Sequence, residues 1–213
     1  MRLLACLLAL GVLWSMVPGG ARADTAEEIL EEVREKYDGI TDAKLTFTQH
    51  VRFSLSAVSQ EMRGTLLMKK PSHYRIELET QTIVTDGETV WSYSRPNNQV
   101  LIDHFALDER SLSPERLLTT APTEYTAALL GEEELEGVTV QVVKLVPKDQ
   151  TGILSSLKLW VDERTALMRQ VEIVDVNGKE TTYTVHSFEI NPGLADSTFR
   201  FTAPAGADVV DLR

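Results

Sequence analysis

After the extreme N-terminal segment, the first apolar residues recur at helical spacing. They are Ile29, Val33, Tyr37 and Ile40. Glutamates occupy most of the positions between them, a pattern typical of an amphipathic helix with one solvent-facing side. Thr25 and Glu28 have the spacing of a capping box, so we expect the helix to begin there and to end at residues 38–39, Asp-Gly.

Beyond Ile40 the hydrophobic period changes to two, which is typical of strands. Leu45, Phe47, Gln49 and Val51 alternate with more polar residues. Further strands are expected at residues 58–69, 74–78, 82–85, 89–94 and 99–104, and then at 138–146, 156–161, 167–175, 180–190 and 198–202. The pairs Asp-Gly at 86–87 and Asn-Gly at 177–178 are signals for tight turns. Short strands joined by such turns predict an antiparallel sheet rather than βαβ units.

Between these two sets, residues 107–131 lose the alternation. Ser113 and Pro114 predict the start of one short helix, and Thr123 begins a second run that ends at Gly131. Helices this short are unstable alone, so we expect both to lie on the sheet. A sheet of about eleven strands curls. The two helices would then cover the opening of its concave side as a movable lid.

The extreme N terminus has the organisation of a secretory signal peptide. Arg2 supplies a positive charge, residues 3–13 are apolar, and residues 21–23, Ala-Arg-Ala, have the small-x-small pattern of a cleavage site. We favour this interpretation over a buried N-terminal helix. We therefore expect a cleaved peptide at residues 1–23 and one exported domain at residues 24–213.

Removing residues 1–23 changes both the cysteine content and the charge. The only cysteine, Cys6, lies in this segment, so the remaining chain would have no thiol, no disulfide and no lipid anchor. The segment holds two arginines and no acid, so the formal net charge changes from −11 to −13. Such a surface repels nucleic acid and anionic membranes, and we expect neither as a partner.

The sequence contains no pattern that predicts catalysis, a cofactor or a metal. Nucleophile-elbow, zincin, C-x-x-C, P-loop and dinucleotide-binding patterns do not occur. The four histidines, His50, His73, His104 and His186, are scattered, and we interpret them as ordinary surface or edge residues. The closest acidic cluster, Asp103, Asp108 and Glu109, is interpreted as a solvated loop rather than an acid–base pair.

Apolar and aromatic side chains are instead concentrated on the short strands. Leu66, Met68, Tyr74, Ile76, Trp91 and Tyr93 lie on adjacent expected strands. Each alone is most simply explained by core packing. A sheet with only three short helices, however, cannot cover both of its faces. Together these residues predict an apolar binding surface.

One stretch has a recognisable order of motifs. Residues 64–76 form a glycine-led strand, two lysines with a proline, and an aromatic strand; residues 86–93 follow as D-G-x-x-x-W-x-Y. Supporting motifs occur at residues 47–49, 113–118, 145–148 and 199–209. No single motif is specific. Together, in this order and after a signal peptide, they resemble the LolA family of periplasmic lipoprotein carriers.

The resemblance implies an incomplete, half-open antiparallel β-barrel with an N-terminal helix and a short helical lid, whose cavity takes the acyl chains of lipoproteins. The family accepts lipoproteins from an inner-membrane ABC release complex and passes them to a lipid-anchored outer-membrane receptor. Without a cysteine, this chain resembles the soluble carrier, a monomer of the periplasm. The residues expected to bind lipid are Phe47, Leu66, Met68, Tyr74, Ile76, Trp91, Tyr93, Leu117, Leu118 and Leu129.

Lys70 and Tyr74 carry separate expectations from the resemblance. Family members have an arginine at the position of Lys70 that hydrogen-bonds the lid, and an ammonium cannot make the same bidentate contact. The aromatic residue corresponding to Tyr74 lies at the cavity mouth, where the release complex docks; a core tyrosine is the alternative. Two other functions stay open: a carrier of the same fold for another lipid or hydrophobic metabolite, and a structural envelope protein whose own side chains fill the cavity.

Overall fold

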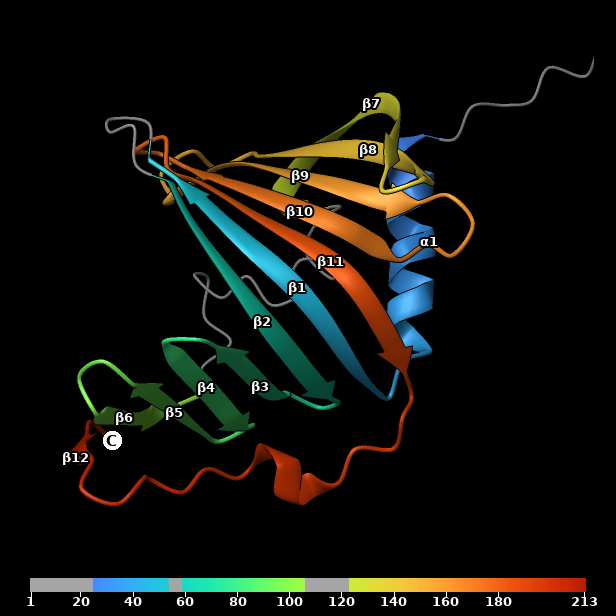
Figure 1. Cartoon of the computed structure of the whole chain (residues 1–213). Helices are drawn as coiled ribbons and strands as arrows, with labels where there is room; N and C mark the ends of the chain where they lie inside the picture. Colours follow the sequence, from blue (N-terminus) through green and yellow to red (C-terminus); the bar gives the residue numbers. More distant parts are fainter. Residues whose placement is uncertain (1–24, 54–58, 106–122) are drawn as a thin grey trace, which may run out of the picture.

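A computed structural model describes residues 25–53, 59–105 and 123–213 (Figure 1). The described chain begins with α1 (Ala26–Asp38) and has a 3-10 helix, η1 (Asp196–Phe199), near its C terminus. The strands are β1 (Asp42–Arg52), β2 (Ser59–Lys69), β3 (His73–Leu78), β4 (Gln81–Asp86), β5 (Thr89–Ser94), β6 (Gln99–His104), β7 (Tyr125–Leu135), β8 (Val138–Pro147), β9 (Leu154–Asp162), β10 (Met168–Asp175), β11 (Glu180–Ile190) and β12 (Asp208–Asp211).

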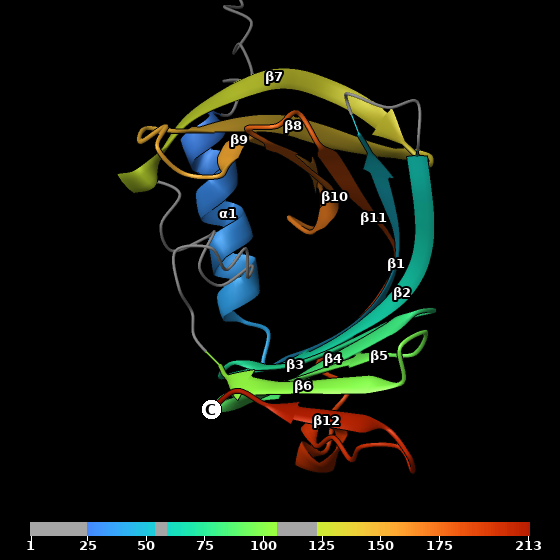
Figure 2. The ribbon, with the colours of Figure 1, turned by 90° about the vertical axis from the view of Figure 1, so that its left-hand side faces the viewer.

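The strands of the described residues form one twelve-stranded sheet, in the order β12-β6-β5-β4-β3-β2-β1-β11-β10-β9-β8-β7. Neighbours are antiparallel, except that β12 runs parallel to β6. Strands β12 and β7 end the order at opposite sides, so the sheet stays open. It curves around α1, which lies on its concave side (Figure 2). The predicted mainly-β, half-open architecture with an N-terminal helix is confirmed.

Helix α1 begins and ends where the sequence predicts. The Glu28 backbone amide donates to Thr25 Oγ1 at 3.2 Å, and the Thr25 amide donates to Glu28 Oε2 at 2.8 Å, which completes the capping box. The apolar side of the helix packs on the concave face of the sheet and forms the main core. Its buried members are Ala26, Ile29, Leu30, Val33, Tyr37, Ile40, Ala43, Met68, Val143, Leu145, Leu157, Leu159 and Val161.

The predicted second lid helix, from Thr123 to Gly131, is wrong over most of its length because the segment forms the start of β7. Alanine and leucine favour helices in isolation. Here, however, the free edge of β8 supplies a ladder of hydrogen bonds, and Ala127 and Leu129 pack against the core around α1. Tertiary pairing therefore overrides local propensity. The predicted first lid helix, beginning at Ser113, lies outside the described residues.

The strand predicted at residues 198–202 is also wrong. Its first part belongs to η1, and residues 200–202 are not in a strand. The strands beside this segment, β3 and β4, are already paired on both sides, so the segment has no edge to join and crosses the outer face of the sheet instead. Phe199 is fully buried there, with its ring centroid 5.5 Å from that of His73. The free edge of β6 is taken by β12.

Polar contacts with β1 and β2 fix the start of this crossing. Asn191 Oδ1 accepts a hydrogen bond from the Thr41 amide at 2.8 Å. The buried carboxylate of Asp42 accepts from the backbone amides of residues 193 and 194. Lys69 Nζ donates to the carbonyl of Leu194 at 2.9 Å. These contacts direct the C-terminal segment away from the concave side.

Candidate functional site

Cross-strand register defines an apolar surface on the concave side of β1, β2 and β3. Side chains opposite one another form three rows, which we call the concave rows: Ala43–Met68–Tyr74, Leu45–Leu66–Ile76 and Phe47–Gly64–Leu78. Ala43 and Met68 belong to the core around α1. Because alternate residues of a strand point to the same face, all three rows face the side on which α1 lies.

The concave rows combine apolar character with partial exposure. Met68 and Phe47 are buried, at 5% and 7% exposure. The other large members, Leu45, Leu66, Tyr74, Ile76 and Leu78, are half-buried. The rows contain no charged group, so they offer a ligand dispersion and hydrophobic contact and no reactive chemistry.

Gly64 allows the most crowded row to close. A Cβ atom at this position would lie 2.6 Å from Cζ of Phe47 and 2.8 Å from Cδ2 of Leu78. The Phe47 ring therefore packs directly over the β2 backbone. This close approach explains why the strand begins its motif with glycine.

Tyr183 on β11 extends the surface from the other side of β1. Its ring centroid lies 5.9 Å from that of Phe47, and Gln49 Nε2 donates to its hydroxyl at 2.9 Å. Burial raises the pKa of Tyr183, and the hydrogen bond from Gln49 offsets this only in part. The phenol is therefore neutral at physiological pH and adds a rigid amphipathic wall to the surface.

Trp91 and Tyr93 do not share the concave face. Trp91 pairs with Val84, and Tyr93 pairs with Thr82. These two residues of β4 alternate along the strand with the β4 residues that continue the concave rows. The ring centroid of Tyr93 lies 6.1 Å from that of Phe201, in the C-terminal segment that crosses the outer face. The structure thus separates these two aromatics from Leu66, Met68, Tyr74 and Ile76, because a strand directs neighbouring residues to opposite faces.

The remaining predicted residues have different placements. Leu129 lies on β7 and packs against the core around α1, whereas Leu117 and Leu118 lie outside the described residues. Lys70 Nζ donates to the carbonyl of Tyr37 at 2.6 Å and lies 4.0 Å from the centroid of its ring. Its described contacts are thus with the C-terminal end of α1, where the helix dipole favours a cation. The predicted lid contact stays a prediction.

Besides the small residues Ala43 and Gly64, sequence reasoning missed three large side chains of this surface. Leu45 was detectable, since it alternates in step with Phe47. Leu78 follows Ile76 at the same spacing. Tyr183 gave no local signal, because the pairing of β1 with β11 brings it to Gln49 across 134 residues of chain.

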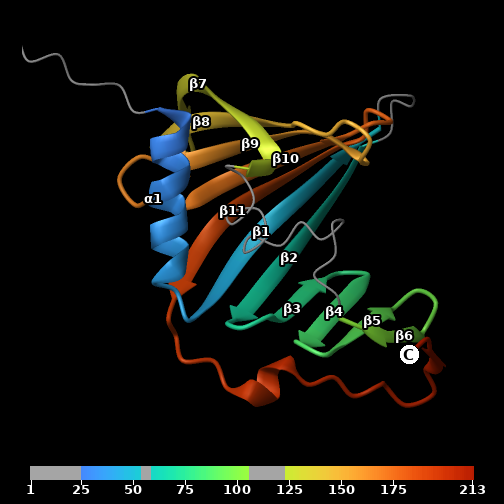
Figure 3. The same ribbon diagram turned by 180° about the vertical axis from the view of Figure 1, so that it is seen from behind.

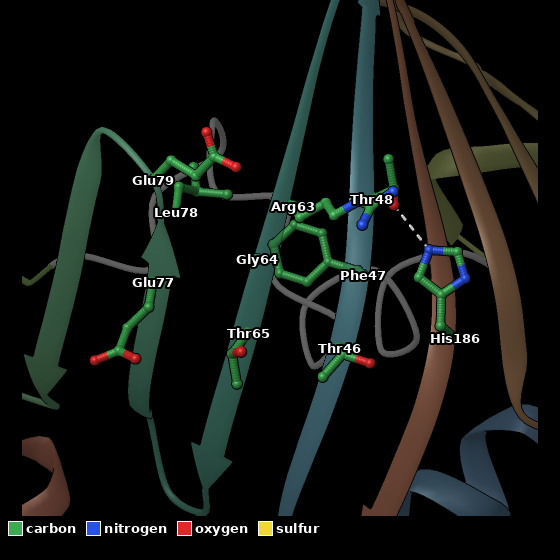
Figure 4. A pocket seen from close by; sticks show the side chains of 10 residues that line it. All are labelled: Thr46, Phe47, Thr48, Arg63, Gly64, Thr65, Glu77, Leu78, Glu79 and His186. Atoms are coloured by element: carbon green, nitrogen blue, oxygen red, sulfur yellow. Dashed lines mark hydrogen bonds between the residues drawn. The ribbon is translucent and has the colours of Figure 1, made fainter.

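The outer face of the same strands has the opposite character. A pocket of about 680 Å³ lies where β1, β2, β3 and β11 bend (Figure 4). One hydrogen bond crosses it, between Thr48 Oγ1 and His186 Nε2 at 2.8 Å. The lining includes Phe47, Gly64 and Leu78 of the concave rows, but its polar and charged majority does not suit an alkyl chain. Most of the lining is polar or charged: Thr46, Thr48, Arg63, Thr65, Glu77, Glu79 and His186.

Within residues 25–53, 59–105 and 123–213, no three His, Cys, Asp or Glu side chains gather as a metal site would require. Across the same described part of the chain, no helix has both the length and the apolar character to span a membrane.

Comparisons with known proteins agree with this architecture. The family model described as outer membrane lipoprotein carrier protein LolA matches residues 38–202. An outer-membrane lipoprotein carrier protein from Hahella chejuensis is 30% identical over 92% of this chain and 91% of its own. A second such protein, from Leptothrix cholodnii, is 31% identical over 90% of this chain and 88% of its own. A solved structure, an uncharacterized conserved protein from Thermus thermophilus, aligns with a TM-score of 0.58 at 17% identity, over 87% of this chain and 98% of that one, which is a likeness of fold alone.

Proposed function

This chain belongs to the LolA family of outer membrane lipoprotein carrier proteins, and we propose that it carries lipoproteins by covering their acyl chains with the concave rows and Tyr183. The observation that carries this proposal is the row of half-buried aliphatic side chains on the concave face, centred on Leu66 and Ile76.

The physical requirement for such a carrier is shielding. Each methylene exposed to water costs about 0.8 kcal/mol, so an acylated protein does not cross an aqueous space unaided. Acyl chains vary in length and bend freely, and they offer no polar group for recognition. A surface of aliphatic and aromatic side chains therefore suits them, and the role requires no catalytic group.

The route of transport belongs to the same proposal. The carrier would lose residues 1–23 on export, accept lipoproteins from an inner-membrane ABC release complex in the periplasm, and pass them to a lipid-anchored outer-membrane receptor. The order of charge, apolar run and Ala-Arg-Ala at the N terminus supports export. Sequencing the exported protein should give an N terminus at Asp24, and retention of residues 1–23 would count against this step.

The decisive test compares two neighbouring positions of β2. Leu66→Asp places a carboxylate on the concave rows, whereas Thr65→Asp places one on the outer face of the same strand. We expect exported protein with Leu66→Asp to lose co-purifying lipoprotein, measured by mass spectrometry, because burying a charge against an acyl chain is unfavourable. The Thr65→Asp variant should retain its lipoprotein.

Thermal melting followed by circular dichroism establishes that both variants are folded. Equal retention of lipoprotein by two folded variants would contradict the role of the concave rows. Recovery of a glycolipid or another hydrophobic metabolite in place of lipoprotein would favour the alternative ligand. Native protein that co-purifies with neither lipoprotein nor another lipid would favour a structural role in the envelope.

A further inference from the structure

The C-terminal end of β1, the turn before β9 and the turn after β10 lie at the end of the sheet farthest from α1 (Figure 1, Figure 3). Each carries an exposed apolar side chain. Phe53 follows β1, Ile153 precedes β9, and Val176 follows β10; their exposed fractions are 37%, 65% and 56%. The Val176 amide donates to the Ile153 carbonyl at 3.0 Å, so these two turns lie side by side. Arg52 pairs with Glu180, which brings Phe53 to the start of β11. We call Phe53, Ile153 and Val176 the apolar tip.

The turns that present Ile153 and Val176 are held by their own carboxylates. Asp149 Oδ1 accepts from the Thr151 amide at 2.9 Å. Asp175 Oδ1 accepts from the amides of residues 177 and 179 at 2.8 and 3.0 Å. The carboxylates are thus directed to the backbone while the apolar side chains project outward. A single exposed apolar residue is ordinary, but Ile153 and Val176 on two adjacent, well-held turns, with Phe53 at the end of the neighbouring β1, form a surface.

The charge at this end differs from that of the molecule. The whole chain has a formal net charge of −11, whereas the bases and acids of the tip turns balance. Glu124, whose carbonyl accepts from the Lys148 amide, adds one acid beside these turns. The end is therefore weakly charged, and on an acidic protein it suits a zwitterionic lipid surface better than a strongly charged partner. The balancing residues are Arg52, Lys148 and Lys179 on one side and Asp149, Asp175 and Glu180 on the other.

We propose that the apolar tip inserts reversibly into the interface of a zwitterionic bilayer. Apolar side chains at the acyl boundary with a lysine at the headgroups are typical of peripheral membrane contacts, and Lys179 is an exposed lysine three residues after Val176. Three side chains anchor weakly, so the protein leaves the membrane again. The inference deepens the proposed carrier role, on which its biological purpose rests, by bringing the carrier to a lipid surface.

The test measures the fraction of exported protein that floats with vesicles of phosphatidylcholine and phosphatidylethanolamine. The tip variant is Phe53→Ser with Ile153→Ser and Val176→Ser. The matched control is Val209→Ser with Leu212→Ser, which removes apolar side chains of similar exposure, 47% and 59%, near the C terminus. We expect the tip variant to lose vesicle binding about tenfold or more, from the apolar area removed, and the control to keep it within about twofold.

A second measurement reports insertion directly. In Ile153→Trp, the added indole should shift its emission to the blue on vesicles and be quenched by lipids brominated near the headgroup, relative to the native protein. Lipoprotein should still co-purify with the tip variant, which separates this inference from the carrier function. Equal vesicle binding by tip and control variants, or an unquenched indole, would overturn it. Self-association abolished by the tip variant, without vesicle binding, would overturn it in favour of a second copy of the chain.

Discussion

Gly64 is the residue at which the packing of the concave rows is tightest. Gly64→Ala should lower the free energy of unfolding by about 1–3 kcal/mol, because the added methyl group meets the rings and branches of Phe47 and Leu78. Gly152→Ala is the control, since nothing lies within 4 Å of a Cβ there, and it should change stability by less than about 0.5 kcal/mol. Urea denaturation of both variants measures the difference. Equal stabilities would mean that Phe47 moves without cost.

Substitution of Tyr74 distinguishes a role in core packing from a role in lipoprotein loading. It is half-buried at the margin of the core, with its ring centroid 6.5 Å from that of Phe105. We expect Tyr74→Glu to fold with a loss of less than about 2 kcal/mol, because the carboxylate can reach water. Lipoprotein loading should fail, and Tyr74→Phe should restore it. A large fall in melting temperature together with lost loading would instead identify a core residue.

Among the elements, the β9–β10 hairpin depends on one buried carboxylate. Asp162, at 1% exposure, accepts hydrogen bonds from Arg169 Nε and Nη2 at 3.1 and 2.9 Å, and from the amides of Arg164 and Thr165. Burial alone would raise the pKa of Asp162. The hydrogen bonds from Arg169, Thr165 and the backbone outweigh burial and hold the pKa below its usual range.

Asp162→Asn should therefore lower the free energy of unfolding by about 2–4 kcal/mol at neutral pH, because Arg169 loses its partner. A carboxylate whose pKa is lower in the folded than in the unfolded state contributes its full stabilisation above the unfolded pKa of about 3.9. This stabilisation is lost as the pH falls through the lower folded pKa. The difference in the free energy of unfolding between native protein and variant should thus be constant near neutrality and decrease only below about pH 4. Denaturation across pH measures this, with the exposed neighbour Glu163→Gln as control. A difference independent of pH would contradict the role of the charge.

At the scale of the whole molecule, the sheet buries apolar side chains on both faces. The largest cluster surrounds α1, a smaller one joins Val140, Val142 and Trp160 on β8 and β9, and Val84, Val100 and Phe199 are fully buried under the C-terminal segment. Phe199→Ala should cost about 3–5 kcal/mol, because the segment cannot fully close the cavity left behind. Below the melting temperature, lipoprotein loading should be unchanged, since Phe199 lies on the outer face. Leu212→Ala, at an exposed position, is the control, and a loading defect in folded Phe199→Ala would show that the two faces are coupled.

The elements that the sequence predicted correctly are those specified by their own residues. The capping box at Thr25 and the strands at residues 89–94, 99–104 and 180–190 have the predicted bounds. The errors occur where distant edges decide. The segment from Thr123 to Gly131 contains good helix formers and yet pairs with β8, and residues 198–202 alternate like a strand and yet have no edge to join.

For the candidate site, alternation alone predicted that Leu66, Met68, Tyr74 and Ile76 are apolar neighbours, and the ordered motifs predicted the family. A hydrophobic period of two predicts that neighbouring residues point to opposite faces of the sheet, but it does not predict which face is concave. The concave face is the one on which α1 packs, and the C-terminal segment covers Tyr93 on the other face. The sequence by itself thus determined the strands and their apolar content. Only the tertiary structure decided which residues share a surface, because contacts such as that of Gln49 with Tyr183 join parts of the chain that carry no local record of one another.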